Sequence, residues 1–137
     1  MARRSEQRRA AAFALYQSEV TGRPLEDTLP RDASLFTRSL AYAAEDRQPE
    51  LDEQIARHAQ GWTIERIAPL EKAIMRTALI EMLHPDAVPA DTPIPPEGAI
   101  EEAVESAKTF CGSDTPAFVN GVLAAALREV RENAQIP

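Results

Sequence analysis

Apolar side chains recur at three- and four-residue spacing through most of this 137-residue chain, and glycine or proline follows many of these runs. This spacing places apolar residues on one face of a helix, whereas a half-buried strand needs strict alternation. Five glycines and 5% aromatic residues favour helices that pack through alanine and aliphatic side chains. The pattern predicts an all-α protein without strands and with six or seven helices. The main predicted runs are residues 5–20, 32–45, 49–60, 69–83, 100–111 and 115–130.

Capping residues and prolines predict where these helices begin and end. Asp32 is the expected N-cap of the second run, and Thr115 with Pro116 is expected to form the cap and first turn of the last. Residues 84–96 contain five prolines and no periodicity, so they predict a stiff loop. Neither side of this loop could bury much core alone. We therefore expect residues 1–137 to form a single domain of two packed helical sub-bundles.

Charge is distributed unevenly along the chain. Residues 1–9 hold four arginines and one acid, a local charge of +3, whereas the whole chain carries −7. The other 128 residues therefore carry −10. Salt screens charges beyond roughly 8–10 Å, so a local basic arm on an acidic body can still contact phosphates. On charge alone, a solvated terminus is the favoured interpretation of this arm.

The sequence lacks the usual signatures of catalysis and metal binding. It has no glycine-rich phosphate loop, no CxxC pair and no His-x-x-x-His, and His58 and His84 have no nearby cysteine. Glu101, Glu102 and Glu105 share a helix that offers no cleft for acid–base chemistry. We expect no enzymatic activity, no cofactor and no metal.

Three features favour the cytoplasm. Cys111 is the only cysteine, so it cannot form an internal disulfide and suits a reducing compartment. No apolar run approaches the roughly 20 residues that span a bilayer. The N-terminal arginines are not followed by a hydrophobic signal stretch.

Three motifs resemble the NusB family of transcription factors. Residues 99–127, AIEEAVESAKTFCGSDTPAFVNGVLAAAL, are similar to the family's acidic helix, short loop and Phe-Val-Asn-Gly-Val-Leu helix. Residues 71–83, EKAIMRTALIEML, resemble its central Glu-Lys helix, and residues 8–20, RRAAAFALYQSEV, resemble its first helix. The motifs occur in the family's order over nearly the whole chain.

The resemblance implies an all-helical fold of two three-helix bundles and a non-catalytic role. It also implies binding to boxA-type single-stranded RNA together with NusE, a small-subunit ribosomal protein, within a transcription elongation complex. Some family members form homodimers, and the sequence leaves that point open. On the resemblance, the residues expected to face RNA are Arg4, Arg8, Arg9, Lys72, Arg76, Lys108, Phe118 and Asn120. Tyr16 and Glu81 match positions that face the partner protein.

Several of these residues have a structural alternative. Arg76 could pair with a neighbouring acid, while Phe118 and Tyr16 could belong to the core. Asn120 could bond backbone instead of RNA. The arm is interrupted by Glu6, and the proline-rich loop is longer than is usual in the family.

Two alternative functions compete with this one, and the acidic body and Glu6 favour the first. The chain could be a protein-interaction module with little RNA affinity of its own, or an accessory domain in RNA modification. Steep weakening of binding by salt would separate an RNA binder from the interaction module.

Overall fold

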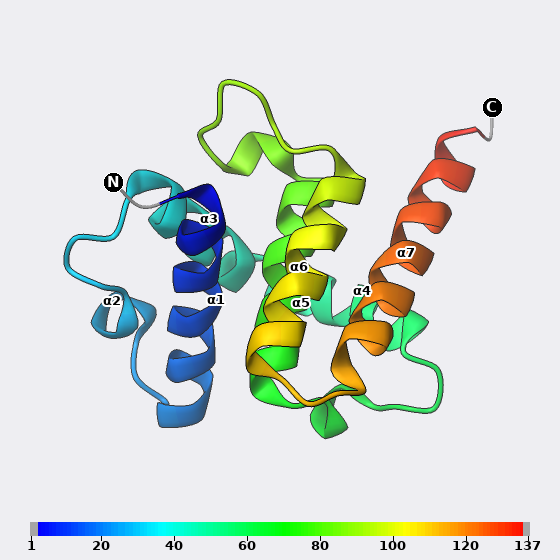
Figure 1. The fold of residues 1–137 in the computed structure, drawn as a ribbon, viewed down its shortest axis with the longest axis horizontal. Helices are drawn as coiled ribbons and strands as arrows, with labels where there is room; N and C mark the ends of the chain where they lie inside the picture. The colour runs from blue at the N-terminus through cyan, green and yellow to red at the C-terminus, as the bar shows by residue number, and fades with distance from the viewer. Residues whose placement is uncertain (1–2, 136–137) are drawn as a thin grey trace.

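The computed structural model describes residues 3–135, and these residues form helices and connecting segments without a strand. Figure 1 shows α5 and α6 at the centre, with α1 on one side and α7 on the other. This arrangement confirms the predicted all-α class. The α-helices are α1 (Arg4–Thr21), α2 (Leu25–Thr28), α3 (Leu35–Asp46), α4 (Gln48–His58), α5 (Pro69–Leu83), α6 (Pro96–Phe110) and α7 (Thr115–Ala134). Two 3₁₀ turns are η1 (Ile64–Arg66) and η2 (Pro85–Ala87).

Helix α5 is the centre of the packing. It contacts α1, α3, α4, α6 and α7, and every residue from Ala73 to Met82 is buried. A helix that is buried all round lacks the polar face of a surface helix. Helix α1 contacts α2 and α3 on one side of α5, and α6 packs against α7 on the other, with α4 against α5 and α7. The buried apolar residues of both groups form one core cluster.

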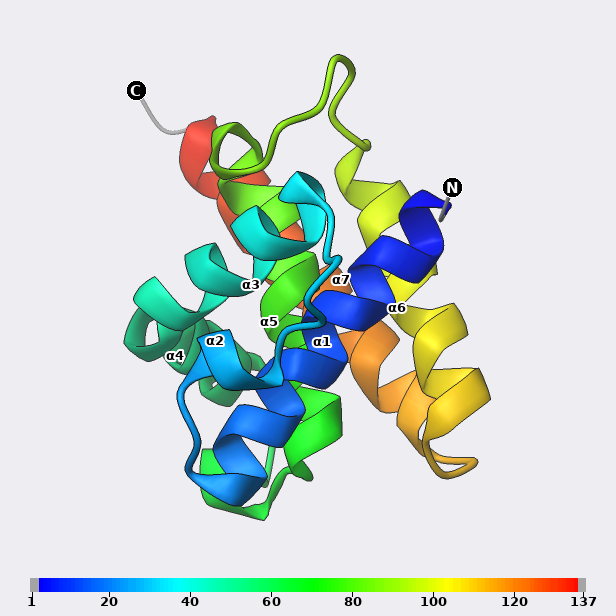
Figure 2. The same cartoon turned by 90° about the vertical axis from the view of Figure 1, so that its left-hand side faces the viewer.

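Helix α1 packs against α5, α3 and α2. Figure 2 shows it in front of α5, with α2 and α3 to one side and α6 to the other. Its last turn ends at Gly22, whose φ of 73° is left-handed and whose N–H donates to the Ser18 carbonyl. Glycine adopts this conformation without a steric penalty, so the predicted end of the first helix is confirmed.

The structure corrects several helix boundaries. Helix α3 begins at Leu35 rather than after Asp32, because the Ser34 hydroxyl accepts the Thr37 N–H at 3.0 Å and caps it. Helix α7 begins at Thr115, one residue after its N-cap Asp114, so Thr115 is not the cap. The short α2 was not predicted. The proline-rich segment is not entirely loop, since it contains η2 and its last residue, Pro96, begins α6.

Within residues 3–135, no helix is both long and apolar enough to cross a membrane. The same residues bring together no group of three His, Cys, Asp or Glu side chains that could hold a metal ion.

Replacing Ser34 by alanine tests the corrected start of α3. The change removes the cap of the α3 N-terminus, so we expect the free energy of unfolding to fall by about 1 kcal/mol. Urea denaturation measures this value. Asp32→Ala is the matched control and should change stability by less than about 0.5 kcal/mol. A larger loss for Asp32→Ala than for Ser34→Ala would mean that Asp32 caps the helix after all.

Candidate nucleic-acid interface

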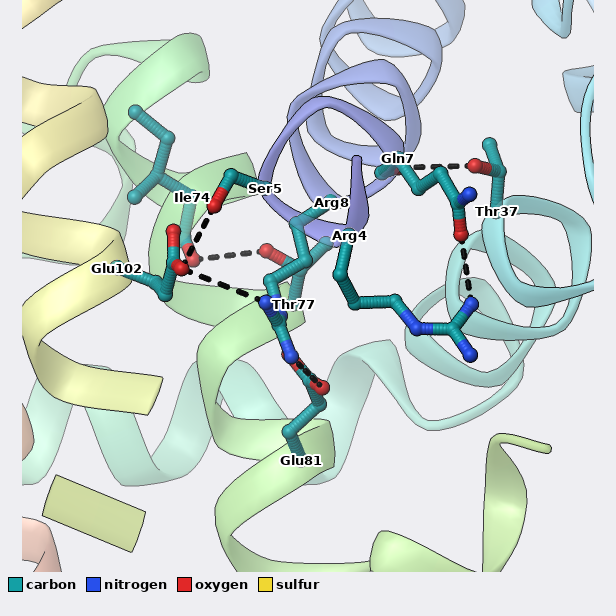
Figure 3. Close-up of polar contacts among 9 residues, drawn as sticks. All are labelled: Arg4, Ser5, Gln7, Arg8, Thr37, Ile74, Thr77, Glu81 and Glu102. Carbon is teal, nitrogen blue, oxygen red and sulfur yellow. Dashed lines mark hydrogen bonds and ion pairs between the residues drawn. The ribbon is translucent and has the colours of Figure 1, made fainter. Parts of the chain in front are cut away.

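The basic arm is part of an ordered helix that is fastened on two sides. Thr37 of α3 donates its hydroxyl to the Gln7 carbonyl at 2.9 Å, and Ser5 donates to the Glu102 carboxylate of α6 at 2.8 Å. Figure 3 shows both contacts on either side of the first turns of α1. From Arg4 onward the arm is therefore not a frayed, solvated end, and its arginines project from a fixed backbone.

Arg8 is held by two carboxylates inside the protein. Its Nε and Nη2 donate to the two oxygens of Glu81 at 2.7 and 3.1 Å, and its Nη1 lies 3.5 Å from Glu102. The Glu81 side chain is only 5% exposed and that of Arg8 14%. Figure 3 shows the guanidinium between the two acids. A paired, two-point contact of this kind is strong, so Arg8 here joins α1 to α5 and α6.

Arg4 and Arg9 form no ion pair with any carboxylate among residues 3–135. Arg4 is exposed, donates to the Gln7 side chain at 2.7 Å, and has its Cζ 4.1 Å from the Phe36 ring centre. The Cζ of Arg9 lies 5.6 Å from the Phe110 ring centre, and its buried Nε has no hydrogen-bond partner. Aromatic faces orient a guanidinium without neutralising it. No carboxylate among residues 3–135 therefore neutralises these two guanidinium groups, which are available to bind a phosphate.

Lys72 and Arg76 belong to a second internal network. Arg76 donates to both oxygens of Asp52 at 2.7 and 2.9 Å, and Glu19 lies 3.4 Å from Arg76 and 3.3 Å from Lys72. The Arg76 residue is 3% exposed. The ion-pair alternative is therefore the correct description of Arg76 in this structure, and its burial removes it from the candidate surface. Lys72 is largely covered in the same network.

Lys108 and Asn120 are exposed, on α6 and α7 respectively. Lys108 contacts Glu105 at 3.3 Å, but both side chains are more than half exposed, so this pair holds it weakly. Their role in RNA contact stays a prediction.

Phe118 was expected either to face RNA or to belong to the core, and it is neither fully exposed nor fully buried. It is half-buried and packs on the core, and its ring meets Trp62 edge-to-face with centroids 6.3 Å apart. Trp62 is 51% exposed and was not predicted as a site residue. The sequence around Trp62 did not indicate a site, because its contact with Phe118 joins residues far apart in the chain.

The two predicted partner-facing residues also lie partly or wholly inside the protein. Tyr16 is half-buried against the core, as its structural alternative proposed. Glu81 is buried beneath Arg8, so in this structure its carboxylate presents no free surface.

Cys111 follows α6 and packs partly against the core. Burial, and to a smaller degree the Glu71 carboxylate, raises the pKa of its thiol above the ordinary value. The protonated thiol is a poor nucleophile, which suits a structural role.

Replacing Arg76 by methionine tests its structural role. The change leaves Asp52 without its partner, so we expect the free energy of unfolding to fall by about 3 kcal/mol in urea denaturation. Arg47→Met is the matched control, because Arg47 pairs with Glu50 where both side chains are about half exposed. That control should lose less than about 1 kcal/mol. Equal losses in the two variants would contradict the structural role.

Comparison with known proteins identifies the family. The NusB family profile matches residues 5–128. The transcription antitermination protein NusB of Rubrobacter xylanophilus is 38% identical over 129 residues, which cover 90% of this chain and 88% of that protein. The solved structure of T. maritima NusB has a TM-score of 0.81 at 25% identity and covers 98% of this chain and 99% of its own. A chain from the crystal structure of the antitermination factors NusB and NusE in complex with dsRNA shares the fold, with a TM-score of 0.77, 21% identity and coverage of 92% and 96%. The chain therefore belongs to the NusB family.

Proposed function

We propose that this protein is a non-catalytic, cytoplasmic transcription antitermination factor that binds boxA-type single-stranded RNA together with NusE. The observation that carries the proposal is that Arg4 and Arg9, on the fastened first turns of α1, have no carboxylate partner among residues 3–135. Guanidinium groups make paired contacts to phosphate oxygens. The family relationship supports the same role, since related NusB proteins are named transcription antitermination proteins.

The proposed mechanism is simultaneous contact. RNA phosphates bind Arg4 and Arg9 of α1, NusE binds another part of the surface, and the pair links nascent RNA to the elongating polymerase. A solved complex of NusB, NusE and dsRNA supports such an assembly, because its NusB-fold chain superposes on nearly all of this chain. No proton transfer or covalent step is required of this protein.

A second candidate is an interaction module with weak RNA affinity. It is favoured by the ion pairs of Arg8, Lys72 and Arg76, which neutralise three of the cations expected at the RNA surface. In this case NusE would supply most of the RNA contacts. RNA binding without and with NusE distinguishes the two candidates.

Anisotropy of labelled boxA-type RNA tests the proposal at several salt concentrations. We expect binding that strengthens with NusE and weakens steeply with salt. In the Arg4→Ala/Arg9→Ala variant, two phosphate contacts are lost. The slope of log affinity against log salt should then become shallower by about 1.4, because each single-strand contact contributes about 0.7.

Arg23→Ala/Arg47→Ala is the matched control, since it removes two arginines from exposed ion pairs away from the arm. This control should keep the wild-type slope. A duplex of the same sequence, tested in parallel, distinguishes single-strand from double-strand preference. No RNA binding with or without NusE would contradict the RNA role, and retained NusE binding would then identify an interaction module.

A further inference from the structure

One face of α7 stays open to solvent within residues 3–135. Figure 1 shows this helix along one edge of the molecule, and its buried side packs on α4, α5 and α6. A surface helix ordinarily carries charged and polar side chains on its outer face. Here the middle of the outer face consists of small residues, which are Ala117, Gly121, Ala124 and Ala125.

Gly121 lies at the centre of this face, and nothing inside the molecule requires a glycine there. Glycine in a helix interior lowers stability relative to alanine, because it loses more backbone freedom on folding. A Cβ added to Gly121 would meet nothing within 4 Å, and its φ is not positive. Neither close packing within residues 3–135 nor a left-handed turn therefore explains this residue. A bare backbone at this position does allow a second helix to approach closely.

Two charges of opposite sign flank Gly121 at equal spacing. Asp114 precedes it by seven residues and Arg128 follows it by seven, and both are exposed. Seven residues are close to two helical turns, so the three positions share one face. Neither charge has an ion-pair partner within the part of the chain that the structure describes.

A two-fold axis through Gly121 makes this surface self-complementary. In an antiparallel pair of α7 helices, each residue before Gly121 lies level with the residue equally far after it in the other copy. Asp114 of one copy then lies level with Arg128 of the second copy, and the reverse pair forms at the same time. Ala117 and Ala125 lie level in the same way, so small side chains meet between the two ion pairs. A second copy of this chain is therefore the partner that fits the charges of this face.

We propose that α7 forms the interface of a homodimer, in which two copies pack antiparallel about Gly121 and pair Asp114 with Arg128. A contact limited to one helix of each copy buries less than the roughly 1,200 Å² of a stable interface, so this dimer is weak and reversible. It leaves Arg4 and Arg9 of α1 uncovered, because α1 and α7 lie on opposite sides of α5 and α6 (Figure 1). The dimer is therefore compatible with the proposed RNA contact and independent of it.

Sedimentation equilibrium of the full chain, without RNA or NusE, tests the proposal. The range is about 10 to 500 µM, because a small interface associates only at high concentration. We expect a reversible monomer–dimer equilibrium. Asp114→Arg and Arg128→Asp should each weaken the dimer about 3- to 30-fold, since each replaces two ion pairs by two like-charge contacts.

An equimolar mixture of these two variants provides the decisive comparison. Each copy then meets opposite charges, so the mixture should recover dimers of wild-type affinity. Arg31→Asp reverses an exposed arginine outside α7 and is the matched control, which should dimerise as the wild type does. Circular dichroism verifies that each variant is folded.

Gly121→Lys separates the interface from the fold. Bulk and like charge would meet at the axis, so the dimer should weaken by at least about 10-fold. The monomer should resist urea at least as well as the wild type, because lysine favours helix over glycine and its Cβ meets no neighbour. Gln17→Lys, at an exposed position of α1, is the matched control and should leave the dimer unchanged.

A disulfide locates the axis. In a Cys111→Ser background, Gly121→Cys should crosslink two copies on mild oxidation, because the two positions face each other across closely packed helices. Ala117→Cys should not crosslink, since its two copies lie about 12 Å apart along the helix direction.

A chain that stays monomeric at every concentration would overturn the proposal. A dimer that resists both charge reversals and Gly121→Lys would also overturn it, because another face would then join the copies. If the chain is monomeric and Gly121→Lys loses NusE binding, the face belongs to that partner instead and the homodimer is wrong.

Discussion

The fold depends on the charged residues that α5 buries. A buried guanidinium or carboxylate without a partner is far costlier than an exposed one, so each charge in α5 requires a partner on a neighbouring helix. Arg76 pairs with Asp52 of α4 and Glu19 of α1, and Glu81 pairs with Arg8 of α1. These pairs hold α1 near both of its ends and α4 along its first turns. Apolar packing alone would specify these helix positions less strictly, because apolar contacts have no direction.

The same constraint divides the arginines of α1 and α5 into two groups. Arg8 and Arg76 hold helices together, and their charge is balanced inside the protein. Arg4 and Arg9, which have no carboxylate partner within residues 3–135, lie on the helix that the first group fixes. An acidic protein can therefore present a local positive site, because a phosphate in contact with these arginines lies closer to them than the screening length. Arg8 and Arg76 therefore fix the helix from which Arg4 and Arg9 are proposed to contact RNA.

The sequence predicted the helices well, because apolar spacing reports which face is buried. It did not predict the short α2 or the Ser34 cap, since capping depends on which of several nearby polar residues reaches the backbone N–H groups. It listed Arg8, Arg76 and Glu81 as surface contacts. Their burial depends on partners 24 to 73 residues away, which local pattern does not reveal. The contact between Trp62 and Phe118 was missed for the same reason, since the two residues lie far apart in the sequence.

The division of the arginines can be tested by comparing Arg8→Ala with Arg9→Ala, each measured for unfolding in urea and for the salt dependence of boxA-type RNA binding with NusE. The account predicts that Arg8→Ala lowers the free energy of unfolding by about 3 kcal/mol, because Glu81 loses its partner, and leaves the salt slope unchanged. It predicts that Arg9→Ala leaves stability within about 1 kcal/mol and makes the slope shallower by about 0.7. The reverse pattern, with a shallower slope for Arg8→Ala at full stability, would contradict the account.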